Sequence, residues 1–304
     1  MHHISPDVAT GAVGRCCSMS RAFSSRADGP LTTHFRVGSG TPIVLLHGGG
    51  LSWRTWRPVL PLLAEHHDVL AVTMAGHRGG ARLADGEVFS PMLLADYVER
   101  ELDEAGIETA HLVGNSLGGW VALELARRGR ARSVVVFSPG GAVPDHGRIL
   151  KAHVSLLGGL LLALGRMPMF GLEALLMKRV ARLGAVKHGR YLSKDDLSGV
   201  LADLDVGRRN LPDLLAWMDE HGAIEPLVAH EFPIRVVWAR NDGVLPLHSC
   251  GRIVRERVPG AEFVVLDEIG HVPVYDDPQL VVDTICTLTK AVDGIDNADD
   301  SCAY

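Results

Sequence analysis

The chain has 304 residues, of which 47% are hydrophobic and 22% charged, and these proportions are ordinary for a globular protein. A formal net charge of -6 without a basic patch argues against nucleic acid or an anionic membrane as a partner. The five cysteines are odd in number and show no metal-type spacing, so we expect reduced thiols in a cytoplasmic protein.

The segment that opens the chain, residues 1–30, lacks the apolar stretch of a secretory signal and has no regular period, which indicates a flexible leader. From residue 31 onward, short apolar runs rich in β-branched residues alternate with longer segments of helical period. This alternation predicts an α/β protein with a mostly parallel central sheet and helices on both faces. The predicted strands cover residues 31–37, 42–46, 69–73, 110–114, 133–137, 234–239 and 262–266, and the predicted helices cover 53–63, 91–104, 117–128, 247–258 and 280–292.

Residues 145–230 interrupt this alternation with apolar, helix-forming sequence. The longest uncharged run, 152–165, is shorter than the roughly 20 residues that a membrane-spanning helix requires, so we expect no stable membrane insertion. The interruption predicts a helical cap inserted between two parts of the core, and a contact of this apolar cap with a lipid surface stays open. The core then consists of residues 31–144 and 231–292, followed by a flexible tail over 293–304.

The sequence Gly-Asn-Ser-Leu-Gly-Gly over residues 114–119 predicts a nucleophile elbow, because it joins an apolar strand to a helix. The turn is so tight that small residues, Gly114 and Gly118, are needed on either side of Ser116. Such a turn leaves the hydroxyl of Ser116 exposed above the sheet. A hydroxyl becomes a nucleophile only beside a base, so the motif predicts a distant histidine and carboxylate.

Two loops that follow the last predicted strands can supply this acid and base. Asp242 comes just after the penultimate strand, and His271 follows the last strand in the corresponding position. Two other acids are alternatives: Asp267 lies next to the last strand, and Asp145 follows an earlier one. We favour Asp242 because Ser116, Asp242 and His271 then stand in the chain order expected of a hydrolase with this architecture.

Together, the elbow, the Asp-Gly-x-x-Pro sequence that begins at Asp242 and the Gly-His-x-Pro sequence around His271 resemble the α/β-hydrolase-fold superfamily. The resemblance covers nearly all of residues 31–292. It implies a serine hydrolase with a helical cap, in which Ser116, Asp242 and His271 form the catalytic triad.

The resemblance also implies a role for the His-Gly-Gly-Gly sequence over residues 47–50. In this family the corresponding loop lends one backbone N–H to the oxyanion hole, and the residue after the nucleophile lends the other. The implied donors are the amides of Gly49 and Leu117. Which of Gly48, Gly49 and Gly50 points inward stays open at the level of sequence.

The remaining histidines have weaker claims to a site. The resemblance implies that His47 and His77 mainly bind nearby backbone. The histidine pairs at 2–3 and 66–67 have no carboxylate or cysteine at metal-ligand spacing, so we expect no metal ion. We also expect no cofactor, because the nucleophile, the base and the oxyanion donors are all supplied by the chain.

These residues predict acyl transfer to water in two steps, with His271 deprotonating Ser116 and Asp242 orienting His271. The apolar cap favours a small to medium hydrophobic ester or thioester as the substrate. A serine at position 116 argues against epoxide hydrolase and haloalkane dehalogenase chemistry, in which a carboxylate attacks carbon.

Two alternative functions stay open, as does the oligomeric state. Asn115 before the serine resembles the elbow of hydrolases that cleave carbon–carbon bonds of ring-cleavage products. Val272 and Leu51 depart from that subfamily, where tryptophan and proline are usual. A protein of this fold can also bind a small molecule without catalysis.

Overall fold

The computed structural model describes residues 31–142 and 185–294. The predicted leader at 1–30, the apolar cap sequence at 152–165, the alternative acid Asp145 and the chain beyond residue 294 lie outside these ranges. Of the five cysteines, Cys250 and Cys286 lie inside them, and both are buried free thiols. Burial raises the pKa of Cys250 to about 11, so this thiol stays protonated at neutral pH.

Seven strands form one sheet in the order β1-β3-β2-β4-β5-β6-β7. β1 runs antiparallel to β3, and all other neighbouring strands of this sheet are parallel. The predicted fold class, α/β with a mostly parallel sheet, is therefore confirmed. The strands are β1 (His34–Gly38), β2 (Thr41–Leu46), β3 (His67–Val72), β4 (Ala110–Asn115), β5 (Ala131–Phe137), β6 (Ile234–Ala239) and β7 (Glu262–Leu266).

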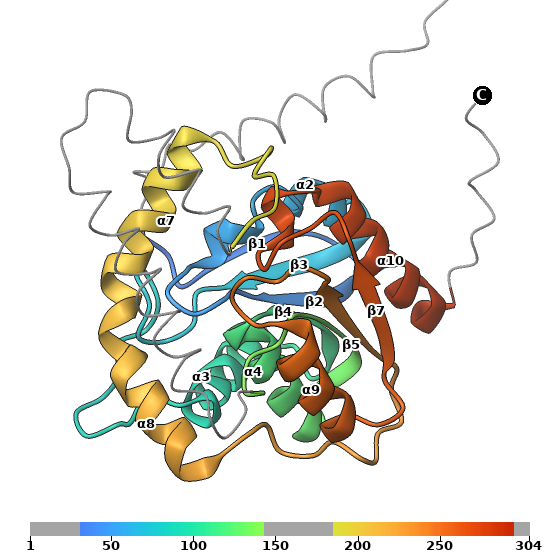
Figure 1. Cartoon of the computed structure of the whole chain (residues 1–304). Coiled ribbons are helices and arrows are strands. Elements are labelled where there is room, and N and C mark those ends of the chain that lie inside the picture. Colours follow the sequence, from blue (N-terminus) through green and yellow to red (C-terminus); the bar gives the residue numbers. More distant parts are fainter. Residues whose placement is uncertain (1–30, 143–184, 295–304) are drawn as a thin grey trace, which may run out of the picture.

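Helices cover both faces of the sheet, with α2 and α10 on one side and α3, α4 and α9 on the other (Figure 1). Successive side chains of a strand point to opposite faces, so Leu112 and Val113 of β4 join different apolar clusters. The core helices are α2 (Leu60–Leu63), α3 (Pro91–Glu104), α4 (Leu117–Arg127), α9 (Arg252–Arg257) and α10 (Pro278–Asp293). The described part of the predicted cap contains α7 (Lys194–Gly207), the short turn η2 (Arg208–Asn210) and α8 (Leu211–His221).

Two predicted helices differ from the observed ones. The segment 53–63 splits into the 3-10 turn η1 (Trp53–Trp56) and α2, because Pro58 has no N–H to continue a helix. The segment 247–258 begins as the π-helical turn η3 (Leu247–Gly251) before α9. The last described helix, α10, includes Asp293, so the first residue of the predicted tail belongs to this helix.

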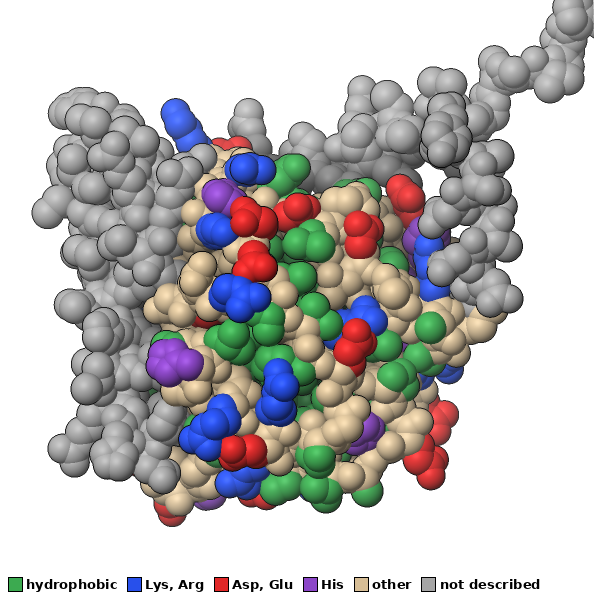
Figure 2. Space-filling view, turned by 45° about the vertical axis from the view of Figure 1, so that its right-hand side comes forward, with side chains coloured by type: hydrophobic (Ala, Val, Ile, Leu, Met, Phe, Trp, Pro, Cys, Tyr) green, Lys and Arg blue, Asp and Glu red, His purple; other side chains and the backbone are tan. Residues whose placement is uncertain are grey.

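The surface carries mixed charge. On the face drawn in Figure 2, Lys and Arg side chains are interspersed with Asp and Glu, and neither sign forms a continuous patch. Among the described residues, no helix has the length and apolar character needed to cross a membrane.

Candidate active site

Ser116 lies at the turn between β4 and α4, where the strand meets the edge of the sheet that the cap covers. Its φ of 54° and ψ of -118° lie outside the regions that residues with a side chain prefer, so the turn stores backbone strain. Hydrogen bonds hold this conformation: Ser116 N donates to Phe137 O at 3.0 Å, and Gly140 N donates to Ser116 O at 2.7 Å.

Close backbone approaches explain the glycines of the elbow. A Cβ atom at Gly114 would lie 2.2 Å from the carbonyl oxygen of Gly118. One at Gly118 would lie 2.2 Å from the carbonyl oxygen of Leu46 on β2. Neither approach leaves room for a side chain, so the predicted tight turn is present and glycine is required at both positions.

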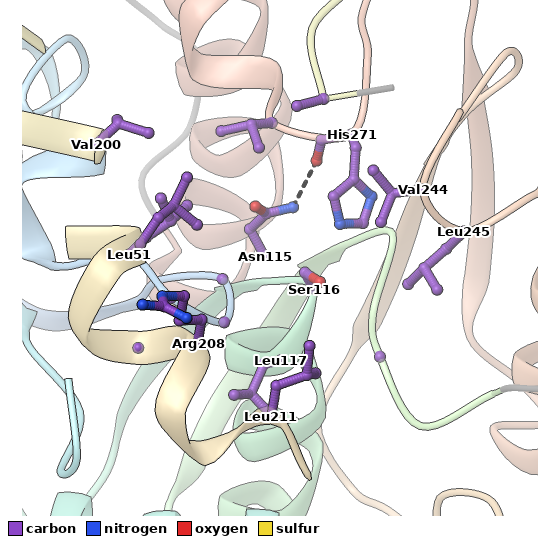
Figure 3. A pocket seen from close by; sticks show the side chains of 18 of the residues that line it. Leu51, Asn115, Ser116, Leu117, Val200, Arg208, Leu211, Val244, Leu245 and His271 are labelled. Carbon is purple, nitrogen blue, oxygen red and sulfur yellow. Dashed lines mark hydrogen bonds between the residues drawn. The ribbon is translucent and has the colours of Figure 1, made fainter. Parts of the chain in front are cut away.

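His271 and Asp242 meet at the same edge of the sheet, from the loops after β7 and β6. His271 Nδ1 donates to Asp242 Oδ2 at 2.8 Å, and both side chains are buried. With its proton on Nδ1, the imidazole keeps Nε2 as an acceptor. Figure 3 shows the ring of His271 beside Ser116 in the wall of one pocket.

Asp242 is fixed and ionised by its surroundings. Its Oδ1 accepts hydrogen bonds from Val244 N at 2.8 Å and Leu245 N at 2.7 Å. Burial by itself raises the pKa of this carboxyl, but the charge and hydrogen bond of His271 and the backbone donors outweigh it, so the pKa is lowered. The alternative acid Asp267 is exposed and pairs with Arg240 instead.

The glycine loop before η1 lies directly against the elbow. A Cβ atom at Gly48 would lie 3.5 Å from Ser116 Cβ, and one at Gly49 would lie 3.6 Å from Leu117 Cδ2. The amides of Gly49 and Leu117 donate no hydrogen bond to another described residue. Two backbone donors beside the hydroxyl are therefore available to an oxygen atom of a ligand.

His47 and His77 stabilise this loop and its neighbour through contacts with the backbone. His47 Nδ1 donates to Gly48 O at 2.8 Å, and its Nε2 accepts from Met74 N at 3.0 Å. His77 Nδ1 lies 3.1 Å from Ala75 O. Burial lowers the pKa of His77 to about 4 and that of His47 well below its usual value, so both rings are neutral. Both histidines bind backbone, as the family resemblance implied.

A cavity of about 320 Å³ lies between the core and the described cap residues, with Ser116 and His271 in its wall. This volume suits a small organic ligand. Among the described lining residues only Arg208 carries a full charge, and its side chain is half exposed and paired with Asp205. The cap side of the cavity is formed mainly by aliphatic side chains of α7 and α8, including Leu197, Val200, Leu201, Leu204, Leu211 and Leu214.

Helix α7 of the cap rests on the glycine loop through a backbone contact. A Cβ atom at Gly207 would lie 2.4 Å from Gly50 Cα, so the backbones of these two segments touch without side chains between them. Asp203 on the same helix accepts a hydrogen bond from Ser52 Oγ at 2.5 Å and pairs with Arg78 at 3.3 Å. The cap helix therefore helps to set the position of the loop that carries the free amide of Gly49.

Asp276 is a site residue that the sequence did not reveal. Its buried carboxylate accepts four backbone hydrogen bonds, from the amides of Lys187, His188, Gly189 and Gly270, at 2.7 to 2.9 Å. Three of these amides belong to the start of the described cap and one directly precedes His271. No local motif indicates such a role, because three of the four donors, Lys187, His188 and Gly189, lie far from Asp276 in the chain.

Comparison with known proteins agrees with the fold. The sequence model of the alpha/beta hydrolase family matches residues 43–284. The chain belongs to the alpha/beta hydrolase family. This assignment is independent of the geometry above and confirms the resemblance found in the motifs.

The relatives to which this chain is similar are named for different activities. Epoxide hydrolase EphH of Mycobacterium tuberculosis is 36% identical over 218 residues, which are 66% of this chain and 95% of that protein. Pimeloyl-[acyl-carrier protein] methyl ester esterase of Aeromonas hydrophila is 29% identical over 82% of this chain and 96% of its own. 2-Hydroxymuconate semialdehyde hydrolase of a Pseudomonas strain is 38% identical over 38% of this chain and 42% of its own. Hydrolysis is the shared chemistry.

Gly207→Ala tests whether α7 positions the glycine loop of this alpha/beta hydrolase. The new methyl group has no room beside Gly50, so we expect kcat/KM for an ester to fall about tenfold and stability to fall by about 1–3 kcal/mol. Gly199→Ala on the same helix is the matched control, because nothing lies within 4 Å of its Cβ position. Equal kinetics of the two variants would show that the contact with the loop has no influence on the site.

Asp276→Ala is expected to lower the free energy of unfolding by about 3–4 kcal/mol, because it leaves buried amides without an acceptor. We also expect kcat to fall, since the loop carrying His271 loses an anchor. Urea denaturation followed by circular dichroism and ester kinetics measure the two effects. Asp283→Asn, on the exposed side of α10, is the control; a stability loss without any change in kcat would refute the positioning role.

Proposed function

We propose that this protein is a serine hydrolase that cleaves carboxylic esters or thioesters of small to medium hydrophobic substrates through an acyl-enzyme. One observation carries the proposal: His271, held by Asp242, lies beside the strained Ser116 in an apolar cavity. This combination supplies a nucleophile, a base and an apolar pocket for the substrate, and acyl transfer uses all three.

The proposed reaction begins when His271 Nε2 takes the proton of Ser116 as its Oγ attacks the carbonyl carbon of the substrate. The amides of Gly49 and Leu117 then stabilise the negatively charged oxygen, each worth about 3 kcal/mol in the transition state. His271 returns the proton to the departing alcohol or thiol. Water attacks the acyl-enzyme by the same route, which releases the acid and restores Ser116.

Epoxide opening is the second candidate, because of the 36% identity to EphH. In that chemistry a carboxylate attacks the epoxide and forms an ester that water can cleave. Ser116 would instead form an ether with the epoxide carbon, and water cannot hydrolyse an ether under these conditions. The serine therefore favours an acyl substrate.

Carbon–carbon bond cleavage has less support once the surroundings of Asn115 are considered. Its Nδ2 donates to Phe137 O at 3.0 Å and to His271 O at 2.8 Å. Both amide hydrogens are thus used to tie the elbow to the loop of His271. The residue that suggested this chemistry has a structural task that an esterase needs equally.

The test compares p-nitrophenyl acetate, butyrate and octanoate with styrene oxide and a ring-cleavage dienone. We expect ester hydrolysis, with kcat/KM rising roughly fourfold per added methylene until the cavity is filled. Diol formation from styrene oxide that outpaces every ester would overturn the proposal. Absence of turnover and of a fluorophosphonate adduct on Ser116 would support a binding protein instead.

A further inference from the structure

His67, His111 and Asp293 come together at the edge of the sheet opposite to Ser116. His67 opens β3, His111 lies near the start of β4, and Asp293 is the last residue of α10. Because Ser116 follows the other end of β4, about 15 Å of strand separate the two places. One nitrogen or oxygen atom from each of the three residues lies within 4.8 Å of those of the other two.

His111 already contacts the carboxylate. Its Nε2 lies 3.2 Å from Asp293 Oδ1 and 3.3 Å from Oδ2, and its Nδ1 lies 2.7 Å from Ser133 Oγ. A serine hydroxyl can donate or accept a hydrogen bond, so Ser133 suits either tautomer of the ring. When Ser133 accepts from Nδ1–H, the lone pair of Nε2 faces the carboxylate and is free to bind a cation.

His67 brings a buried nitrogen that has no hydrogen bond of normal geometry among the described residues. Its Nε2 lies 3.0 Å from Thr289 Oγ1, whereas its Nδ1 is buried near the Thr41 backbone and forms no hydrogen bond of normal geometry with a described residue. The side chain is only 1% exposed, so water does not reach it freely. A buried polar atom left in this state is unfavourable, and a ligand bound to it would remove that cost.

The three groups are in the protonation state that metal ions require. Burial lowers the pKa of both His67 and His111, so both rings are neutral near pH 7. Burial by itself raises the pKa of Asp293, but contacts with Thr41, Arg132 and His111 outweigh it and lower the pKa, so the carboxylate is ionised. Two neutral imidazoles and one carboxylate are ligands that Zn²⁺ prefers.

We propose that His67, His111 and Asp293 supply three ligands of a buried zinc site. Tetrahedral zinc with bonds of about 2.0–2.1 Å sets its ligands roughly 3.3 Å apart, which is the present separation of His111 Nε2 and Asp293. Arg132 contacts Oδ1 of Asp293 at 3.1 Å, and the Thr41 side chain also hydrogen-bonds this carboxylate, so both hold it in place for the ion. The ion would fasten the end of α10 to β3 and β4. Sequence spacing gave no sign of it, because the partners of His67 come from other elements.

The test adds Zn²⁺ or Co²⁺ to the chelator-treated full chain near neutral pH. We expect one tight Zn²⁺ per chain, a rise in the unfolding temperature, and the intense visible absorption of tetrahedral Co²⁺. Asp293→Asn and His67→Gln should each weaken binding at least about tenfold, while ester kinetics stay as in the unmodified chain. The exposed neighbour variant His66→Gln should bind as the unmodified chain does.

The unmodified chain alone can overturn the proposal, by showing no thermal stabilisation with zinc and no tetrahedral cobalt spectrum. Binding that persists in both ligand variants would assign the metal to other histidines or thiols of the chain. Circular dichroism of each variant establishes that it is folded. If neither variant folds, the stoichiometry and cobalt spectrum of the unmodified chain still decide between a zinc site and a plain hydrogen-bonded cluster.

Discussion

Ser116→Ala is expected to lower kcat for ester hydrolysis by about 10⁴–10⁶-fold while KM changes little. The variant removes the only atom that can form the acyl-enzyme in the proposed mechanism, and the free amides of Gly49 and Leu117 leave a small residual rate. Steady-state hydrolysis of p-nitrophenyl butyrate measures the effect. Ser198→Ala, on the exposed face of α7, is the matched control and should keep full activity.

The strain at Ser116 adds a second expectation for the same position. Glycine adopts a φ of 54° without the cost that a side chain imposes, so Ser116→Gly should be inactive yet about 1 kcal/mol more stable than the unmodified protein. Thermal or urea unfolding measures this gain. A glycine variant that keeps ester activity would contradict the assignment of the nucleophile, and one that loses stability would contradict the strain.

Asp242→Asn is expected to lower kcat by about 10⁴-fold at neutral pH. An amide at this position can donate to His271 Nδ1, which favours the tautomer with its proton on Nε2 and removes the acceptor that faces Ser116. The measurement is ester kinetics over a range of pH. Asp267→Asn is the matched control: it is close to His271 in sequence but exposed and paired with Arg240, so a change below about twofold is expected.

The pH dependence of Asp242 follows from its lowered pKa. The carboxylate is favoured in the folded protein, so its contribution to stability is present above the ordinary value of 3.8 and is lost as pH falls through the lower folded pKa. Loss of activity between pH values of about 5 and 7 should therefore not arise from protonation of Asp242. If the acid limb of the kcat profile disappeared in Asp242→Asn, this assignment would be wrong.

Much of the fold and of the candidate triad could be predicted because the signals are local. Buried parallel strands need continuous apolar runs, and the elbow needs glycine at fixed offsets from Ser116, so a short stretch of sequence carries each signal. The places where prediction missed are also local: Pro58 breaks a helix that apolar periodicity alone would continue.

The choice between carboxylates required the tertiary structure. Asp242 and Asp267 both follow strands at the same sheet edge, and the chain order of the family favoured the first without excluding the second. Burial and the hydrogen bond to His271 distinguish them, since Asp242 is enclosed and Asp267 points to solvent. Such a difference depends on what packs around each side chain.

The sequence by itself determined the α/β architecture, the elbow around Ser116 and the order of nucleophile, acid and base. Only the tertiary structure brought Asp276 to the amides of residues 187–189, Gly207 to Gly50, and His67 to Asp293. The physical reason is the separation of the interacting residues along the chain. A turn or an apolar period depends on neighbouring residues, whereas these contacts join segments that meet only after the sheet and its covering helices have packed.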